Sequence, residues 1–277
     1  HVAKEHLLEK QIEKNGLSGY DFSITDKAMK KLISSYTREA GVRSLERKIG
    51  EICRKAAREF LEEGKGSIKV TETSLKNYLG KERYTVNRLN DADDIGIVRG
   101  LAWTSVGGDT LEIEVNVMPG KGELLLTGQL GDVMKESAMA GISYIRSVSR
   151  EYGIDDKFFK ENDIHIHIPE GAVPKDGPSA GITMATAMTS AITKLPVRAD
   201  IAMTGEITLR GRVLPIGGLK EKLLAAKNAG IRLVLVPEKN RPDVAEISSE
   251  IKKGLEIRFV SHMDEVLKAA LVKNSEN

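Results

Sequence analysis

The segment 171–181 is the feature that most constrains this chain. It contains two prolines and three glycines, and a run of small and apolar residues follows it at 182–188. This composition predicts an irregular loop that leads into a buried helix. Ser179 then lies at a helix N-terminus, where backbone N–H groups lack intrahelical partners and attract negative charge. A hydroxyl in that place can cap the helix, bind a phosphate, or attack a carbonyl whose oxyanion those N–H groups stabilise.

The chain divides into two parts with different patterns. Residues 1–80 carry apolar residues at helical spacing, which predicts a small all-α domain. A polar run over 81–94, rich in Asn and Asp, predicts a linker. Within 95–277, alternating segments such as 111–117 are interspersed with amphipathic ones. That pattern predicts an α/β (α+β) domain with mixed sheets and packed helices.

Charge and cysteine content exclude several classes of function. Lys and Arg number 42 against 40 Asp and Glu, a net charge of +2, so a nucleic-acid partner is not indicated. No segment approaches the roughly 18 apolar residues of a membrane span, so no membrane partner is predicted. Cys53 is the sole cysteine, which excludes an internal disulfide and fits a reducing, cytoplasmic location. The chain starts at His1 inside helical sequence, which predicts a fragment of a longer protein.

A serine nucleophile needs a base, and histidine is the commonest one. The second part of the chain has His165, His167 and His262. His165 and His167 are two residues apart on a predicted strand and therefore share a face, a spacing that also suits a metal site. No nearby acidic pair completes a metal sphere, so no metal is predicted. We interpret these histidines as structural or supporting, with a catalytic base as the alternative.

Lysine is the other base found in serine enzymes, and it requires a desolvated site that lowers its pKa. The helix predicted over 217–229 offers a test, because its apolar residues form one arc at about 100° per residue. Lys222 falls inside that arc, whereas Lys220 and Lys227 fall outside it. A lysine in an apolar stripe costs stability unless it is paired or snorkels. Lys222 is therefore a candidate base, and a snorkelling lysine is the alternative.

Three long motifs resemble the proteolytic domain of the Lon family of ATP-dependent proteases, most closely the bacterial soluble type. They are PKDGPSAG at 174–181, TGEITLRG at 204–211 and LPIGGLKEK at 214–222. They occur in the family's order, and the resemblance covers essentially the whole chain. It implies that Ser179 is the nucleophile and Lys222 the general base of a Ser-Lys dyad.

The resemblance also implies roles for neighbouring residues. Thr204 matches a threonine that hydrogen-bonds the catalytic lysine, and Asp176 matches an acid beside the dyad. Asp176 has two opposed roles open to it: tethering the loop, or pairing with Lys222 and holding it charged. His165, His167 and Glu114 match positions near the site with supporting roles at most. For Trp103, we prefer burial in the core to contact with substrate.

The first domain resembles the lid, the small α-domain of an AAA+ ATPase module. Arg43, within 40–43, matches the sensor-2 arginine that approaches the nucleotide phosphates. No Gly-x-x-x-x-Gly-Lys-[Ser/Thr] phosphate loop occurs in the chain, so the ATP-binding core is missing. The resemblance implies ATP and Mg²⁺ as cofactors of the full-length protein, and none for this chain. We expect no ATP hydrolysis from it alone.

The predicted function is therefore an endopeptidase that hydrolyses unfolded or damaged proteins through a Ser-Lys dyad. The family works as a hexameric ring, which implies a homo-oligomer. Two alternatives belong to other classes. One is a non-enzymatic module that mediates ring assembly, and the other is a phosphate-binding domain like those of small-molecule kinases.

Overall fold

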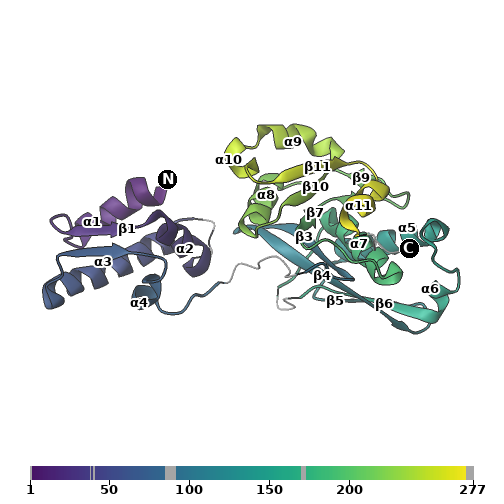
Figure 1. The fold of residues 1–277 in the computed structure, drawn as a ribbon, viewed down its shortest axis with the longest axis horizontal. Coiled ribbons are helices and arrows are strands. Elements are labelled where there is room, and N and C mark those ends of the chain that lie inside the picture. Colours follow the sequence, from purple (N-terminus) through teal and green to yellow (C-terminus); the bar gives the residue numbers. More distant parts are fainter. Residues whose placement is uncertain (1, 38, 40, 85–91, 170–172, 273–277) are drawn as a thin grey trace. The chain divides into compact units, whose positions relative to one another are not determined.

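The structure is a computed structural model that describes residues 2–37, 39, 41–84, 92–169 and 173–272. The chain divides into two compact units, residues 1–86 and 87–277 (Figure 1). Of the predicted linker 81–94, residues 85–91 lie outside the described part. The N–H groups of Arg83 and Tyr84 donate to Ser35 O in the first unit, whereas Asp94 forms a bridge with Val197 in the second. The described ends of that segment are therefore each fastened to their own unit.

The first unit is built around one long amphipathic helix, α3 (Arg43–Glu63). The apolar residues of its inner face recur at helical spacing and are buried, whereas Leu61 is exposed, and Gly64, left-handed at φ 62°, ends the helix. Cys53 lies fully buried on this face, as its position predicts, and burial raises the pKa of its thiol to about 11. The other helical segments are η1 (Ala3–Leu8), α1 (Glu9–Lys14), α2 (Asp26–Tyr36) and α4 (Leu75–Leu79).

The first unit also contains a two-stranded parallel sheet, which the prediction of an all-α domain omits. Its strands are β1 (Asp21–Ile24) and β2 (Ser67–Val70), with Ile24 paired to Val70. Ile24, Ile68 and Val70 are buried on its inner side. Strands of four residues are too short for alternation to stand out from helical spacing in the sequence. The unit is thus mainly helical, and a short sheet closes one side of its core.

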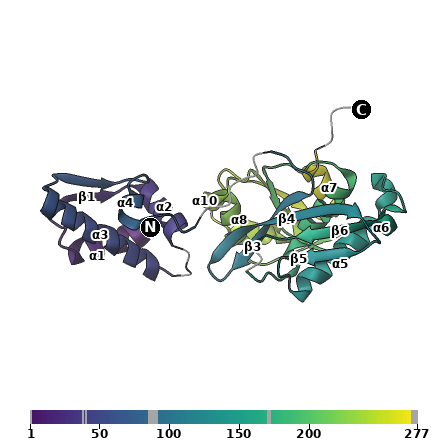
Figure 2. The ribbon, with the colours of Figure 1, turned by 90° about the horizontal axis from the view of Figure 1, so that it is seen from below.

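The second unit contains a seven-stranded mixed sheet in the order β11-β10-β7-β3-β4-β6-β5, whose strands are labelled in Figure 1. Figure 2 shows β3, β4, β6 and β5 from a second direction. β3, β7, β10 and β11 pair in parallel, β4 is antiparallel to both neighbours, and the edge strand β5 is parallel to β6. A separate hairpin joins β8 (Glu206–Ile207) to β9 (Val213–Leu214). The strands of the large sheet are β3 (Ile97–Thr104), β4 (Gly107–Pro119), β5 (Leu124–Thr127), β6 (Asn162–His167), β7 (Ile201–Met203), β10 (Leu233–Pro237) and β11 (Glu256–Val260).

Two apolar clusters cover the two faces of this sheet. Helices α5, α7 and α11 contribute to one cluster, together with Val98 and Met203, whereas α8 and α9 contribute to the other, together with Leu101 and Ala202. Every residue of α7 from 181 to 192 is buried, as expected of a helix that is apolar all round. The helical segments are α5 (Asp132–Ser147), η2 (Ser149–Tyr152), α6 (Phe158–Glu161), η3 (Pro178–Ala180), α7 (Gly181–Thr193), α8 (Leu219–Asn228), η4 (Glu238–Asn240), α9 (Arg241–Glu246), α10 (Ser249–Lys252) and α11 (Met263–Ala270).

Helix α8 lies directly on the β3–β4 hairpin. A Cβ on Gly108 would lie 2.0 Å from Glu221 O, so only glycine allows this approach of strand and helix. At the start of α8, Gly218 is left-handed at φ 67°, and a Cβ there would lie 2.8 Å from Trp103 Cβ. The prediction that Trp103 belongs to the core is wrong, because its side chain is 63% exposed. Trp103 lies near the end of β3, where the backbone of Gly218 comes close to its Cβ while the side chain stays largely exposed.

None of the helices within the described residues combines the length and the apolarity that crossing a membrane requires.

Candidate active site

Ser179 and Lys222 approach one strand end from opposite faces of the sheet. Ser179 lies in η3, at the start of α7, and Lys222 lies in α8. Successive residues of a strand point to opposite faces, so Thr204, just after β7, shares the α8 face with Ala202. The carboxyl ends of parallel strands are where α/β sheets usually place their ligands. The fold therefore brings Ser179 and Lys222 to the carboxyl end of β7, a place where such sheets commonly bind ligands.

The main chain of Ser179 is held by the segment that follows β7. Its carbonyl oxygen accepts from the N–H of Gly205 at 2.8 Å and from Oγ1 of Thr204 at 3.3 Å. In return, the N–H of Ile182 donates to the carbonyl of Gly205 at 3.1 Å. A Cβ on Gly181 would lie 2.8 Å from the backbone N of Ile207, so α7 begins in close contact with β8. These contacts fix the direction in which the serine side chain leaves the backbone.

Lys222 is buried, with 3% of its surface exposed. Its Nζ donates to Oγ1 of Thr204 at 3.1 Å, its one hydrogen bond within the described residues. Burial lowers the pKa of the amine to about 8, because the charged form loses its hydration. The prediction from helical spacing, that Lys222 faces inward while Lys220 does not, agrees with the exposure of Lys220. A lysine in this state is neutral in a substantial fraction of molecules under mildly alkaline conditions.

Thr204 connects the two candidates through one oxygen atom. Its hydroxyl accepts from Lys222 Nζ and donates to the carbonyl of Ser179, and the side chain is fully buried. Among the described residues, no hydrogen bond joins the Ser179 hydroxyl to the lysine amine. Catalytic hydrogen bonds are often long or absent without substrate and tighten when it binds. Thr204 thus binds the backbone of Ser179 and the side chain of Lys222 at the same time.

Asp176 is tied to the N-terminus of α5. Its Oδ1 accepts from the N–H groups of Met134 at 3.0 Å and of Gly177 at 2.8 Å. A Cβ on Gly131, the residue before α5, would lie 2.2 Å from the carboxyl carbon. A carboxylate in that place satisfies a free N–H of the helix and interacts favourably with its dipole. Burial lowers the pKa of Lys222, whereas a carboxylate paired with its amine would raise it. The geometry thus favours the tethering role of the two that the sequence left open.

The structure brings Glu114, His165 and His167 together on neighbouring strands, away from direct contact with the lysine. Glu114 and His167 are register partners on β4 and β6, so their side chains share a face. The Thr127 hydroxyl lies 2.9 Å from Nε2 of His165 and 2.7 Å from Nδ1 of His167. No group of three or more metal-binding side chains occurs among the described residues. The supporting role of these three residues stays a prediction.

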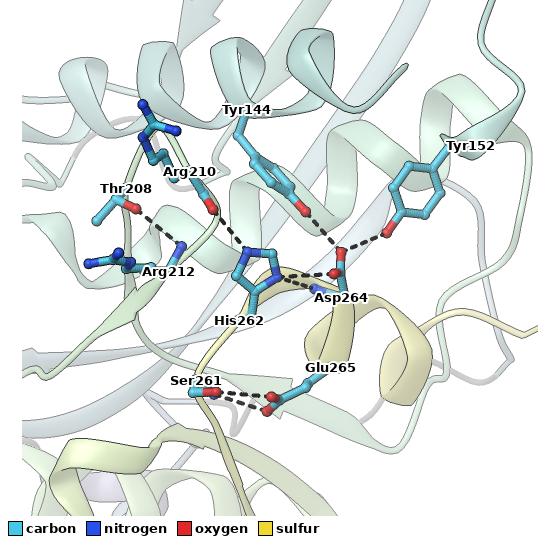
Figure 3. Close-up of polar contacts among 9 residues, drawn as sticks. All are labelled: Tyr144, Tyr152, Thr208, Arg210, Arg212, Ser261, His262, Asp264 and Glu265. Atoms are coloured by element: carbon cyan, nitrogen blue, oxygen red, sulfur yellow. Dashed lines mark hydrogen bonds and ion pairs between the residues drawn. The ribbon is translucent and has the colours of Figure 1, made fainter. Parts of the chain in front are cut away.

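His262 belongs to a separate polar cluster (Figure 3). Its Nε2 lies 2.9 Å from the carbonyl of Arg210, which can only accept, so we assign the ring hydrogen to Nε2. Its Nδ1 lies 3.2 Å from Oδ2 of Asp264, whose Oδ1 accepts from Tyr144 and Tyr152. Burial and this carboxylate raise the pKa of Tyr152 to about 12. Nε2 of His262 is bonded to the β8–β9 turn, and Nδ1 accepts from the N–H of Asp264 at the start of α11. Both ring nitrogens are therefore occupied, which excludes His262 as the base for Ser179 in this arrangement.

Arg43 is the first residue of α3 and is exposed. This exposed position fits a side chain that reaches toward a ligand. It fits an ordinary surface arginine equally well. Its sensor-2 role therefore stays a prediction.

Two polar contacts near the site were not predicted from the sequence. Ser137 on α5 donates to the carbonyl of Pro178 at 3.3 Å, immediately before the candidate nucleophile. Asn240 binds the backbone of Ile216, which precedes α8. Ser137 is detectable in principle as a polar residue on the inward stripe of α5. Asn240 carries no such signal, because its partner is a backbone group in a distant loop.

Replacing Thr204 by valine tests whether its hydroxyl, which bonds to both Ser179 and Lys222, matters for activity. The variant keeps the shape but leaves Nζ of Lys222 without its acceptor and the Ser179 carbonyl with one donor fewer. An unsatisfied buried group costs about 1–3 kcal/mol, so we expect the rate of peptide cleavage to fall about 10- to 100-fold. Thr204→Ser keeps the hydroxyl and is expected to retain most activity. Equal rates for wild type and Thr204→Val, measured with one fluorogenic peptide, contradict this role.

Comparison with known proteins identifies the class. A model of the Lon protease (S16) C-terminal proteolytic domain matches residues 69–273, and a model of the Lon protease AAA+ ATPase lid domain matches residues 13–69. The chain thus combines a proteolytic domain of the Lon (S16) type with an AAA+ lid that precedes it. The models meet at residue 69, within β2, although the pairing of β2 with β1 makes that strand part of the first unit.

The chain belongs to the Lon protease family. The Lon protease of Lachnoclostridium phytofermentans is 60% identical over 98% of this chain and 38% of its own length. For the Lon protease of Clostridioides difficile these values are 56%, 100% and 35%, and for that of Bacillus thuringiensis 54%, 98% and 34%. The chain therefore spans about a third of the length of these relatives. The family predicted from the three motifs is confirmed.

Proposed function

We propose that this chain is an endopeptidase with a Ser179–Lys222 dyad. Neutral Lys222 accepts the proton of the Ser179 hydroxyl, and Oγ attacks the carbonyl carbon of a peptide bond. The resulting lysine ammonium returns the proton to the leaving amine, and an acyl-enzyme forms. Water then attacks the ester, with Lys222 again accepting a proton, and releases the acid product. The single observation that carries this proposal is the buried, partly neutral amine held at the threonine that binds the Ser179 backbone.

Backbone N–H groups at the start of α7 are the candidates for stabilising the oxyanion. The N–H groups of Gly181 and Ile182 already donate to the carbonyls of Pro178 and Gly205. We therefore assign this role to the N–H groups of Ser179 and Ala180, which precede them in the same turn. A preorganised donor of this kind is worth roughly 3–4 kcal/mol of transition-state stabilisation.

We propose unfolded or damaged proteins as the substrates, and this chain acting alone has no phosphate-loop motif with which to drive unfolding of a folded one. We propose that cleavage by this chain needs no ATP, and that ATP with Mg²⁺ and Arg43 act only together with a nucleotide-binding core. Assembly into a hexameric ring and a cytoplasmic location are further proposals drawn from the family.

The test of function is hydrolysis of an unfolded protein and a fluorogenic peptide, with covalent labelling by a serine-directed phosphonate. We expect cleavage without ATP and a single adduct, mapped to Ser179 by peptide mass spectrometry. Oligomer size is measured on the same samples by light scattering. If oligomers form while neither labelling nor cleavage occurs, the non-enzymatic assembly module replaces this proposal.

Activity is expected to rise with pH in a defined window. The lowered pKa of about 8 means that Lys222 is about 10% neutral at pH 7 and about 90% neutral at pH 9. The sign follows because the neutral amine is the active form, so kcat/KM rises about tenfold per pH unit below this pKa and levels off above it. The measurement is kcat/KM for one peptide from pH 6 to 10, with circular dichroism confirming the fold at each pH. A flat profile contradicts a lysine base.

A further inference from the structure

Asn240 is a buried side chain with no role in the mechanism above. It is 2% exposed and lies where η4 ends and α9 begins. Its Oδ1 accepts from the N–H of Ile216 at 2.9 Å, and its Nδ2 donates to the carbonyl of Ile216 at 2.9 Å. The same Nδ2 donates to Oδ2 of Asp243 at 2.6 Å. The amide therefore pairs with one residue's backbone in both directions, as a neighbouring strand does, and Asp243 fixes its orientation.

The backbone that Asn240 holds leads directly into the helix of the catalytic lysine. Ile216 is followed by Gly217 and Gly218, and Gly218 precedes the first residue of α8. A Cβ on Gly217 would meet nothing within 4 Å, so the segment is held at the preceding residue, where Ile216 packs against the apolar cluster of the α8 face and bonds to Asn240. An open pocket of about 490 Å³, lined by residues from 216–221 and 243–248, separates the start of α8 from the α9 region. Hydrogen bonds from Asn240 bridge the two sides of this pocket.

A shift at the start of α8 is transmitted to Lys222. The N–H of Lys222 donates to the carbonyl of Gly218 at 3.1 Å, so the lysine lies one turn into the helix. A helix moves as a unit. A rotation of α8 that turns Lys222 away from the sheet therefore exposes the amine to water and breaks its hydrogen bond to Thr204. The buried amide of Asn240 opposes this rotation, because breaking its bonds to the half-buried Ile216 leaves the buried Oδ1 of Asn240 without its donor.

We infer that Asn240 is a positioning residue for Lys222: by clamping Ile216 it keeps the start of α8 in place and the lysine amine buried against Thr204. The catalytic part of this inference rests on the proposed protease function. The structural part concerns only the environment of Lys222 and is testable without cleavage.

The charged groups around α8 do not account for the lowered pKa of Lys222. Strands β3 and β4 and helices α9 and α10 pack against α8. On the α8 face of those strands, Arg99 lies 3.4 Å from Glu112, and Glu114 pairs in register with Ile97. The charged residues of the two helices are Arg241, Asp243, Glu246, Glu250 and Lys252. Burial of the amine lowers the pKa of Lys222. Loss of burial is therefore the change through which Asn240 acts.

The experiment compares Asn240→Leu with Asn228→Leu. Both replace an amide by an apolar group of similar size, but Asn228 is exposed at the far end of α8. The pKa of Lys222 is measured by NMR titration of ¹³C-labelled lysine, with the Lys222→Met variant identifying its signal. We expect Asn240→Leu to raise this pKa by about one pH unit and to lower kcat/KM about tenfold at pH 7. Activity returns at pH 10, and Asn228→Leu behaves as wild type.

Two results overturn the inference. One is a folded Asn240→Leu variant whose Lys222 titrates as in wild type. The other is an equal loss of activity at every pH, which indicates general damage rather than displacement of the lysine. If Asn240→Leu does not fold, Asp243→Ala takes its place, because it frees the amide without removing it. Asp243→Ala is expected to change the pKa in the same direction by a smaller amount, and an unchanged pKa overturns the inference. If wild type cleaves no peptide, the titration still decides the role of Asn240.

Discussion

The Ser179→Ala variant is expected to cleave peptides more slowly than wild type by a factor on the order of 10⁴ or more. Alanine removes the only atom that attacks the substrate carbonyl, and losing a serine nucleophile removes the covalent path entirely. The fold is expected to persist, because the contacts of Ser179 with Thr204 and Gly205 use its backbone carbonyl, which alanine keeps. The measurement is kcat/KM for a fluorogenic peptide, beside a thermal melt of each protein.

Ser143→Ala is the matched control for this variant. Ser143 is exposed on α5, and its hydroxyl donates to the carbonyl of Met139 at 2.8 Å, as a surface helix serine often does. We expect wild-type cleavage from it. Residual hydrolysis by Ser179→Ala above one part in a hundred, in protein free of contaminating peptidase, refutes Ser179 as nucleophile. A phosphonate adduct on another serine refutes it independently.

Replacing Lys222 is expected to cause a loss of cleavage on the order of 10³-fold or more, whichever residue replaces it. Lys222→Met keeps the length and the burial but has no amine. Lys222→Arg keeps a donor for Thr204, but a guanidinium stays charged in proteins and accepts no proton from the serine. Loss in both variants therefore separates the base from a mere hydrogen-bond donor. Lys222→Met is expected to be the more stable, because burying a charge without a partner is costly.

Lys220→Met is the control on the same helix, since Lys220 is exposed. It should retain wild-type kcat/KM and the same dependence on pH. If Lys222→Arg keeps more than about a tenth of the activity, the amine acts through charge or hydrogen bonding, and the proposed mechanism is wrong. If Lys222→Met is inactive but also unfolded, the arginine variant decides.

The sequence predicted the burial of Lys222 correctly, because one local pattern carried the information. The arc of α8 distinguished Lys222 from Lys220 because helical periodicity and the cost of a buried charge act within one helix. Asp176 was ambiguous, since its partner is the N–H of Met134, 42 residues away in the chain, and no spacing rule connects them. Asn240 was missed for the same reason.

The class of the fold was predicted more accurately than its short strands and the burial of Trp103. The mixed α/β unit and the long α3 helix follow from sustained periodicity. The strands β1 and β2 have four residues each, and pairing across α2 and α3, rather than their own pattern, forms them. Trp103 was placed in the core because aromatic side chains are usually buried, but it lies near the end of β3 and its side chain is largely exposed. Such errors arise where tertiary contacts, not local preference, decide the outcome.

The approach of Ser179 and Lys222 from opposite faces of one sheet affects what a newly synthesised chain can do before it has folded. Neither α7 nor α8 alone carries a reactive pair, and the pair forms only once β7 has been inserted between β3 and β10 with a helix packed on each side. Those contacts are distant in sequence and therefore form late in folding. On the proposed mechanism, a newly made chain is harmless to other unfolded chains around it, including its own copies. Its correct folding is then itself the activation step that a zymogen achieves by cleavage.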